Sequence, residues 1–288
     1  MSATHTYLPY KAEVSVPSKR LPAGACDCHF HVFEDANQYP FAAARSYTPT
    51  PAPMGAYRAM TRTLGIERAV LVHPSVYGRD HSSFEHALAE NTSWLRGVAV
   101  VYTDISDRQI QYWHQLGARG TRCNALFDGG AAMQDLQEIV ASIKPLGWHL
   151  QVLIDVDKDP DMVIKMSRFG VPLVVDHYGH VPAERAINSK GFNNLQALIK
   201  EGNTWVKLSG GYRISPQRSK FTDVAPLMQA LLKANPDRLV WGSDWPHPSI
   251  AAPMPDDGHL IDALLDACGP QEIQKILVDN PTRLYWND

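Results

Sequence analysis

The chain is organised around the stretch Val240-Trp241-Gly242-Ser243-Asp244-Trp245-Pro246-His247-Pro248. Its apolar start predicts a short buried strand, and Gly242 and Pro246 interrupt that strand and begin a loop. The first ionisable side chain of the loop is Asp244. The pattern therefore predicts a carboxylate at the C-terminal end of a buried strand.

Two stretches upstream have the same layout, an apolar run that ends in imidazoles. They are Cys26-Asp27-Cys28-His29-Phe30-His31 and Val174-Val175-Asp176-His177-Tyr178-Gly179-His180. Because the C-terminal ends of parallel strands lie at one end of a barrel, we expect these three strand ends to meet at one rim. Histidines and a carboxylate gathered there would make a site.

Eight strand candidates alternate with helices along the chain. The predicted strands cover residues 25–32, 68–73, 97–101, 120–124, 148–154, 171–176, 204–208 and 238–241. The predicted helices cover residues 54–64, 84–91, 107–116, 133–146, 160–169, 192–201, 224–234, 260–267 and 271–278. This alternation predicts an α/β fold, a single (β/α)8 TIM barrel. The alternative is an open doubly wound sheet, which the lack of a Gly-x-Gly-x-x-Gly turn and of a P-loop disfavours.

The composition favours one large domain without a nucleic-acid surface. Of 288 residues, 27 are Lys or Arg and 30 are Asp or Glu, a net charge of -3, and the basic residues form no runs. We expect residues 25–288 to form the barrel domain and residues 1–24 a flexible N-terminal arm. The lack of an apolar leader and of any run of about 18 apolar residues predicts a cytoplasmic protein that enters no membrane. Four scattered cysteines predict free thiols, and a homodimer is the base-rate expectation.

Polar residues gather at the predicted C-terminal strand ends, where the catalytic groups of such barrels lie. His29 and His31 are two apart on one strand, so both should point into the barrel, and Cys28 should point to the opposite side. Two inward imidazoles can bind a divalent metal ion or donate hydrogen bonds to a developing oxyanion. A lone buried histidine more often only packs, and a lone aspartate can cap a loop. Joined by His177 and Asp244, the pair favours a functional site.

These motifs resemble the amidohydrolase superfamily, and within it amidohydrolase-related family 2. The resemblance is carried by the His-x-His on the first strand, the Asp-His on the sixth and the Gly-Ser-Asp-Trp-Pro-His on the eighth, and it spans residues 24–285. Residues 27–33, with Tyr39-Pro40-Phe41 and Arg45-x-Tyr47-Thr48-Pro49, are similar to the 2-pyrone-4,6-dicarboxylate lactonase group in particular. The resemblance implies a distorted TIM barrel that hydrolyses a cyclic ester.

The resemblance also implies a role for each strand-end residue. Asp244 would be the general base that takes a proton from the attacking water. The imidazoles of His29, His31 and His177 would polarise the lactone carbonyl and stabilise the oxyanion. Guanidinium groups hold a carboxylate through paired hydrogen bonds, so the expected substrate is a small anionic lactone. The residues expected to contact it are Tyr47, Ser75, Arg122, His180, Arg213 and His247.

Two interpretations of the metal follow from the same resemblance. Many superfamily members bind one or two divalent ions here, often with a carboxylated lysine on the fourth strand, where this chain offers Arg122 and Cys123. A bridged two-metal centre is therefore not expected. The lactonase group implies no required cofactor, whereas its sulfomuconolactone-hydrolysing neighbours imply a single divalent ion such as zinc. The ligands of that ion would be His29, His31, His177 and Asp244.

One departure from the group concerns the charge of the substrate. The group's second arginine, a few positions after Arg122, has no counterpart in Leu126-Phe127-Asp128-Gly129-Gly130, which weakens the case for two substrate carboxylates. The leading hypothesis is hydrolysis of a lactone similar to 2-pyrone-4,6-dicarboxylate or muconolactone by carboxylate-activated water. The alternatives are a sugar-acid lactone isomerase, a decarboxylase of the same superfamily, and a catalytically dead binding barrel.

Overall fold

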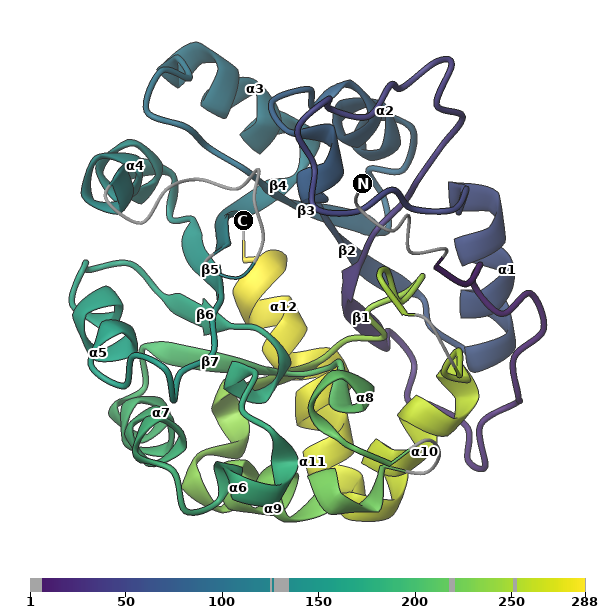
Figure 1. Ribbon diagram of the computed structural model, residues 1–288, viewed down its shortest axis with the longest axis vertical. Helices are drawn as coiled ribbons and strands as arrows, with labels where there is room; N and C mark the ends of the chain where they lie inside the picture. The colour runs from purple at the N-terminus through teal and green to yellow at the C-terminus, as the bar shows by residue number, and fades with distance from the viewer. Residues whose placement is uncertain (1–6, 125, 127–134, 218–220, 251–252, 288) are drawn as a thin grey trace, which may run out of the picture.

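The computed structural model describes residues 7–287, with gaps at residue 125 and at residues 127–134, 218–220 and 251–252. Eight strands form one sheet in which each strand pairs in parallel with the next. The strands are β1 (Cys26–Phe30), β2 (Arg68–Val72), β3 (Leu95–Ala99), β4 (Ala118–Asn124), β5 (His149–Leu153), β6 (Leu173–Val175), β7 (Thr204–Leu208) and β8 (Leu239–Trp241). The sheet curves into a ring (Figure 1), which confirms the predicted single TIM barrel.

Helices surround this ring (Figure 1). They are α1 (Met54–Leu64), α2 (Ser82–Glu90), α3 (Asp107–Leu116), α4 (Leu136–Ile143), α5 (Met162–Ser167), α6 (Ala183–Ala186), α7 (Lys190–Glu201), α8 (Gly211–Ile214), α9 (Ala225–Ala234), α10 (Asp257–Ala267), α11 (Pro270–Gln274) and α12 (Asn280–Tyr285). Short turns accompany them: η1 (Ser75–Tyr77), η3 (Lys144–Leu146), η4 (His177–Gly179), η5 (Thr222–Val224), η6 (Pro236–Arg238) and the π-helical η7 (Lys275–Asp279). The first residues of the predicted helix 133–146 lie outside the described residues.

Local signals set the ends of the helices that the sequence predicts best. α1 and α3 cover the predicted residues 54–64 and 107–116. α1 ends before Gly65, whose φ of 80° lies in the left-handed region that a residue with a side chain rarely adopts. α3 begins after Ser106, whose side chain accepts a hydrogen bond from the Gln109 backbone N–H. In both helices a cap residue, and not packing alone, sets the boundary.

The seam between β8 and β1 joins the loop after β8 to the first strand. The ladder there is reduced to one parallel bridge between Phe30 and Trp245. Two backbone hydrogen bonds accompany it: Asp244 N donates to His29 O at 2.8 Å, and His31 N donates to Trp245 O at 2.8 Å. The closure of the barrel therefore fixes Asp244 relative to both histidines of β1.

β1 carries one more residue than the stretch of β2 beside it. The register of the pair shifts between Asp27 and Phe30, as in a β-bulge, and a bulge interrupts the alternation of side chains. Cys28 consequently lies in the barrel interior, on the same side as His29, in contrast to the prediction that it would point away. The prediction for Cys28 was wrong because strict alternation assumes an unbulged strand.

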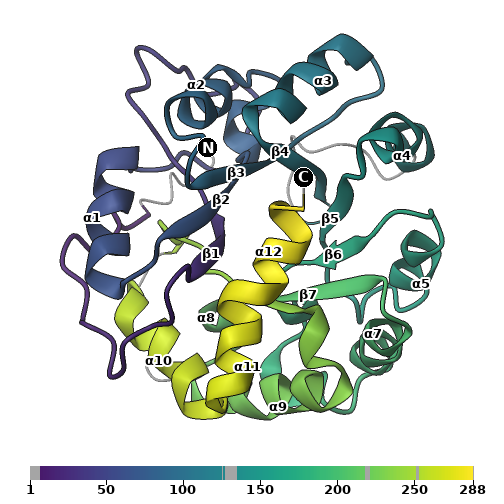
Figure 2. The same ribbon diagram turned by 180° about the vertical axis from the view of Figure 1, so that it is seen from behind.

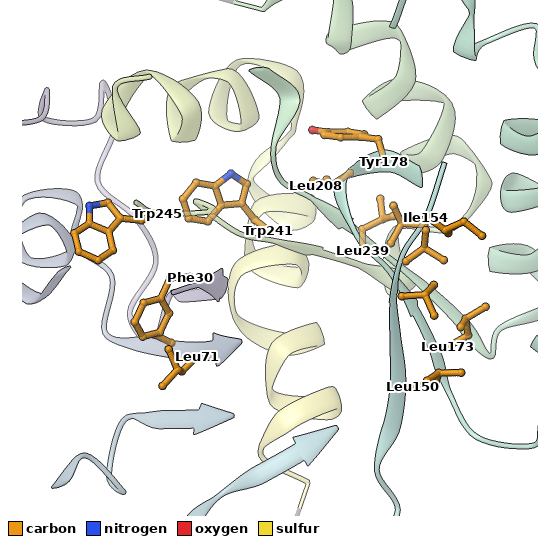
Figure 3. Packing of buried hydrophobic residues seen from close by; sticks show 14 of the residues in the cluster. Phe30, Leu71, Leu150, Ile154, Leu173, Tyr178, Leu208, Leu239, Trp241 and Trp245 are labelled. Carbon is orange, nitrogen blue, oxygen red and sulfur yellow. The ribbon is translucent and has the colours of Figure 1, made fainter. Parts of the chain in front are cut away.

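The hydrophobic core has an outer and an inner part. The outer part lies between strands and helices, and Figure 3 shows its packing, with Leu150, Leu173 and Trp241 among the side chains drawn. The inner part fills the lower barrel with Cys26, Cys28, Val70, Val72, Val98, Val174, Trp205, Val240 and Tyr285. Tyr285 belongs to α12, which crosses the barrel on the side facing the viewer in Figure 2. An apolar plug thus closes the N-terminal end and leaves the C-terminal end for polar groups.

The described part of the N-terminal segment lies against α10. Lys11 Nζ lies 2.5 Å from Asp256 Oδ2, and Ser18 N donates to Asp262 Oδ1 at 2.7 Å. The division of the chain at residue 24 into arm and domain stays a prediction. All four cysteines are buried, and they form no disulfide. Within the described ranges, no helix combines the length and the apolar character needed to cross a membrane.

Candidate functional site

The four residues predicted to be catalytic meet at the C-terminal end of the barrel. Asp244 Oδ1 lies 3.8 Å from His29 Nε2 and 4.0 Å from His31 Nε2, and Asp244 Oδ2 lies 3.9 Å from His177 Nε2. The Nε2 atoms of His29 and His31 are 3.3 Å apart. All four side chains are buried. The structure therefore brings together one carboxylate and three imidazoles, and their catalytic roles stay predictions.

Two of these residues have backbone conformations that are unfavourable for a residue with a side chain. Asp244 has a φ of 63° and His177 a φ of 50°. Residues held in the left-handed region cost of order 1–3 kcal/mol each and gather at functional sites. Asp244 is held there by its backbone bond to β1, and His177 begins the turn η4 directly after β6. The strain supports the view that function, and not folding, selects these conformations.

A second contact orients each of two site imidazoles. His31 Nδ1 lies 2.7 Å from the carbonyl oxygen of Val72, and His177 Nδ1 lies 2.8 Å from Ser209 Oγ. A carbonyl oxygen can only accept, so His31 Nδ1 carries the hydrogen and its Nε2 presents a lone pair to the site. In its neutral form His31 is thus an acceptor, in contrast to the donor role that the resemblance implied.

Charge around Asp244 keeps this carboxylate ionised. Burial alone raises the pKa of Asp244, but the Arg213 guanidinium and the neighbouring imidazoles outweigh burial and hold the pKa well below its ordinary value. Arg213 Nε donates to Asp244 Oδ2 at 2.5 Å, and Tyr212 OH donates to the same oxygen at 2.6 Å. This carboxylate therefore stays ionised to low pH and is a weaker base for that reason.

The imidazoles have pKa values shifted towards the neutral form. Burial lowers the pKa of His31 to about 4 and that of His177 to about 3, although Asp244 opposes the shift in both. Burial also lowers the pKa of His29 well below its usual range, against the opposing Asp176 carboxylate. Near neutral pH the site therefore combines an ionised Asp244 with three neutral rings.

A pocket opens above this cluster and encloses about 410 Å³, part of it open to solvent. Five of the six residues predicted to contact substrate line it: Tyr47, Ser75, Arg122, His180 and Arg213. Sequence reasoning missed other lining residues, including Asn124, Leu153 and Ser249. The sequence therefore predicted most of the polar wall. Of the missed residues, Asn124 and Leu153 end β4 and β5, and Ser249 lies in the loop after β8.

The sixth predicted residue, His247, does not line this pocket. It is buried behind the loop, where its Nε2 lies 3.2 Å from Asp257 Oδ1 and its ring meets the Tyr212 ring edge-on at 5.0 Å. The cause is a tight turn in which His247 N donates to Asp244 O and His247 has a φ of 60°. The prediction that His247 contacts substrate is corrected by this placement. Its neighbour Tyr212 contacts Asp244 instead.

The two arginines of the pocket differ in their partners. Arg213 is bound to Asp244 and to the Pro248 carbonyl oxygen. Arg122 donates from Nε to Asp176 Oδ2 at 3.1 Å, and the residue lines the pocket. Most of the segment in which the group's second arginine was missing, residues 127–130, lies outside the described residues. Of the two arginines, Arg122 is the better placed to bind a substrate carboxylate.

Three further residues below the cluster were missed as site components. Lys207 of β7, Gln151 of β5 and Asp176 after β6 are fully buried inside the barrel under His29. A signal was present, because a lysine within the apolar run 204–208 is unusual for a buried strand. Sequence alone does not say which of its neighbours such a lysine contacts.

Among the described residues, one group has the spacing of a metal site. The ligand atoms of His29, His177 and Asp244 all lie within 4.8 Å of one another, and two imidazoles with a carboxylate suit a single zinc ion. His31, the fourth predicted ligand, lies outside this group. The residues thus fit one divalent ion by donor type and spacing.

Comparisons with known proteins complete this description. A family model described as amidohydrolase matches residues 26–286. The 2-pyrone-4,6-dicarboxylate hydrolase of Comamonas testosteroni is 36% identical over 296 residues, covering 98% of this chain and 97% of its own. The 4-sulfomuconolactone hydrolase of Hydrogenophaga intermedia is 32% identical over 271 residues, covering 92% and 89%. A solved structure from Pseudomonas putida, described as a 2-pyrone-4,6-dicarboxylic acid hydrolase, matches with a TM-score of 0.81 at 31% identity, covering 92% and 98%.

Proposed function

Since the chain belongs to the amidohydrolase family, we propose that it is a lactonase that opens a small anionic lactone by attack of water on the ester carbonyl. One observation carries the proposal: an ionised carboxylate, Asp244, faces three imidazoles at the floor of a pocket whose wall presents Arg122. The lactone hydrolases among its relatives support the same class of substrate, since they match nearly the whole chain.

Asp244 is the general base of the proposed reaction. Its Oδ1 atom faces His29 and His31, while Oδ2 is bound by Arg213 and Tyr212, so Oδ1 is the oxygen that receives the water proton. His31 Nε2 is the second acceptor near this water, because its Nδ1 hydrogen is used on a backbone carbonyl. Two acceptors on one side of the water orient its lone pair towards the lactone carbonyl.

The remaining groups hold the lactone and stabilise charge. N–H groups of His29 and His177 polarise the carbonyl oxygen, and a preorganised donor of this kind contributes about 3 kcal/mol in known cases. Arg122 binds the substrate carboxylate, while Tyr47 and Ser75 complete the wall of the pocket. After collapse of the tetrahedral intermediate, the proton held by Asp244 passes to the leaving oxygen and yields an open-chain acid.

A bound zinc ion, held by His29, His177 and Asp244, would supply a Lewis acid for the carbonyl oxygen. The roles of Arg122 and Arg213 are unchanged in either case, because both keep their partners. We place the enzyme in the cytosol, because its four buried cysteines form no disulfide and disulfides are rare in that compartment. The homodimer stays a base-rate expectation.

The test is a pH-indicator screen of anionic lactones with the purified protein, combined with elemental analysis and with chelation. We expect acid release from a lactone that carries one or more carboxylates, and one solvent oxygen in the product when the reaction runs in heavy-oxygen water. An isomerised lactone without solvent oxygen would contradict hydrolysis, and released carbon dioxide would indicate a decarboxylase. Activity that disappears on chelation and returns with zinc would assign the His29, His177 and Asp244 group to a metal.

A further inference from the structure

Five polar side chains from different strands meet inside the barrel directly below the imidazole cluster. Lys207 Nζ lies 2.7 Å from Gln151 Oε1, 3.3 Å from His29 Nδ1 and 3.6 Å from Asp176 Oδ1. Asp176 Oδ2 accepts from Arg122 Nε at 3.1 Å and from Gln151 Nε2 at 3.0 Å. Such a layer of a TIM barrel is usually filled by branched aliphatic residues, as the layer beneath it is here.

The burial of Lys207 has to be compensated by a structural or functional role, because burying a charged group costs several kcal/mol even when it is paired. Lys207 has no exposed surface, and Asp176 is the carboxylate next to it. Arg122 already neutralises Asp176 through a hydrogen bond at 3.1 Å. The lysine is therefore not required as the counter-ion of Asp176. Its other contacts are Gln151 Oε1 at 2.7 Å and His29 Nδ1 at 3.3 Å, and of these two only His29 belongs to the imidazole cluster.

The directions of the hydrogen bonds can be followed along the cluster. His31 Nδ1 donates to the Val72 carbonyl, so its Nε2 can only accept. The contact between the Nε2 atoms of His31 and His29, at 3.3 Å, then requires the hydrogen to lie on His29 Nε2. A neutral imidazole carries one hydrogen, so His29 Nδ1 is left as an acceptor, and Lys207 is the donor that reaches it.

Asp176 is the competing partner for the same nitrogen. Its Oδ1 atom lies 3.3 Å from His29 Nδ1, the same distance as Lys207 Nζ. A hydrogen on His29 Nδ1, however, would leave two lone pairs facing each other between His29 and His31. The contact between the two imidazoles therefore favours the bond from Lys207 over the bond to Asp176.

We propose that Lys207 is a positioning residue that fixes His29 with its hydrogen on Nε2. His31 Nε2 accepts this hydrogen in the resting site, and the reacting carbonyl takes the place of His31 as its acceptor when the lactone binds. A cationic donor on Nδ1 withdraws electron density from the ring and makes the Nε2–H group a stronger donor to the oxyanion. For His29 to ligate a metal through Nε2, the hydrogen would have to move to Nδ1 and the bond from Lys207 would break. The kinetic part of this inference depends on the proposed lactonase activity, whereas the tautomer does not.

The direct test is NMR of the resting wild-type protein with ¹⁵N-labelled histidine, read through two-bond ¹H–¹⁵N correlations. A His29→Gln variant assigns the His29 signals by their loss. We expect the hydrogen on Nε2 of His29, and a hydrogen on Nδ1 would overturn the proposal. Because this measurement needs no substrate, it tests the tautomer even if the lactone class is wrong.

The second test is Lys207→Met, which keeps the length of the side chain and removes the donor. We expect the hydrogen of His29 to redistribute towards Nδ1, and kcat for the lactone to fall by about 10- to 100-fold with a much smaller change in KM. A folded variant that keeps both the wild-type tautomer and the wild-type kcat would refute the inference. Lys190→Met, which replaces an exposed lysine of α7, is the matched control and should keep both.

Asp176→Asn separates the two candidate partners of His29 Nδ1. Because we assign the bond to Lys207, the hydrogen of His29 should stay on Nε2 in this variant. A tautomer that changes in Asp176→Asn but not in Lys207→Met would assign control to the carboxylate and overturn the proposal.

Discussion

Two groups of buried histidines in this barrel differ in what faces their ring nitrogens. His29, His31 and His177 surround Asp244 under an open pocket. His73 and His81, after β2, stack on each other at 4.0 Å with nearly parallel rings. Burial lowers the pKa of every one of these imidazoles. A shifted pKa therefore does not by itself distinguish a site from a packing cluster.

The difference lies in the partners of the nitrogen atoms. His81 Nδ1 contacts the Arg79 carbonyl at 3.1 Å, and His81 Nε2 accepts from the Val100 backbone N–H at 3.3 Å. The other face of its ring stacks on Trp113 at 4.4 Å. Backbone groups thus bind both ring nitrogens of His81, and aromatic rings stack on its faces. The Nε2 atoms of the site imidazoles face a carboxylate instead. The comparison indicates that the functional site is distinguished by an ionised carboxylate, Asp244, that faces the ring nitrogens of its histidines.

Removing that acceptor should have the largest effect. We expect Asp244→Asn to lower kcat by about 10²- to 10⁴-fold, the usual contribution of a general base, since an amide cannot take the water proton. Lactone hydrolysis and far-ultraviolet circular dichroism measure activity and fold together. A folded variant with near-normal turnover would remove the distinction between the two histidine groups.

Removing the cation beside the acceptor should shift the pH profile. Arg213 is the main cause of the low pKa of Asp244, so Arg213→Met should raise that pKa. The base is active when ionised, and a higher pKa means that it becomes protonated at a higher pH. The acid limb of kcat/KM should therefore move to higher pH, and an unmoved limb would show that Arg213 does not set the ionisation of Asp244.

Removing the hydrogen-bond partner of a single site imidazole should have a smaller effect on kcat. Ser209→Ala removes the hydroxyl that lies 2.8 Å from His177 Nδ1. Without it the ring can rotate or change its tautomer, and we expect kcat to fall about 10-fold with little change in stability. Ser209→Thr, which keeps a hydroxyl at the same position, should restore part of the loss, and equal losses in both variants would contradict this role.

A substitution in the cluster of His73 and His81 should change the stability of the protein and not its catalysis. Burial lowers the pKa of His81 to about 4, so between about pH 6.5 and pH 4 the unfolded chain binds a proton that the folded chain does not. The stability that depends on neutral His81 is present above pH 6.5 and is lost as the pH falls, by about 3 kcal/mol in total.

His81→Phe should remove this acid sensitivity and leave kcat nearly unchanged, although the unsatisfied Val100 N–H costs about 1–3 kcal/mol at neutral pH. Urea unfolding at several pH values measures the slope for both proteins. Parallel slopes in variant and wild type would mean that His81 is not a source of acid lability, and a large loss of kcat would place it in the site.

The strands and the longer helices were predictable because local signals and short periodicities encode them, whereas α6, α8 and α12 were not among the predicted helices. α1 and α3 have the predicted bounds, whereas β3 begins at Leu95, two residues before the predicted strand. The start of β3 was missed because Arg96, its second residue, is charged and interrupts the apolar pattern. The site residues His29, His31, His177 and Asp244 were predictable because barrel strands present their C-terminal ends at one rim.

Other features depend on contacts between residues distant in the chain, which no local pattern encodes. The bulge in β1 follows from its register with β2, so Cys28 was placed on the wrong side. The turn after Asp244 sends His247 behind the loop to Asp257 and out of the pocket. These two errors have the same origin, a backbone conformation set by tertiary hydrogen bonds.

The amino-acid sequence by itself determined the barrel, the rim on which the chemistry lies and the residue types of the site, because strand and helix periods and strand-end motifs are local properties. Only the tertiary structure decided the protonation and the direction of these groups. The low pKa of Asp244 comes from Arg213, and the orientation of His29 from Lys207, which lies 178 positions away in the chain. Electrostatic interactions and hydrogen bonds depend on distances in space, and folding alone sets those distances.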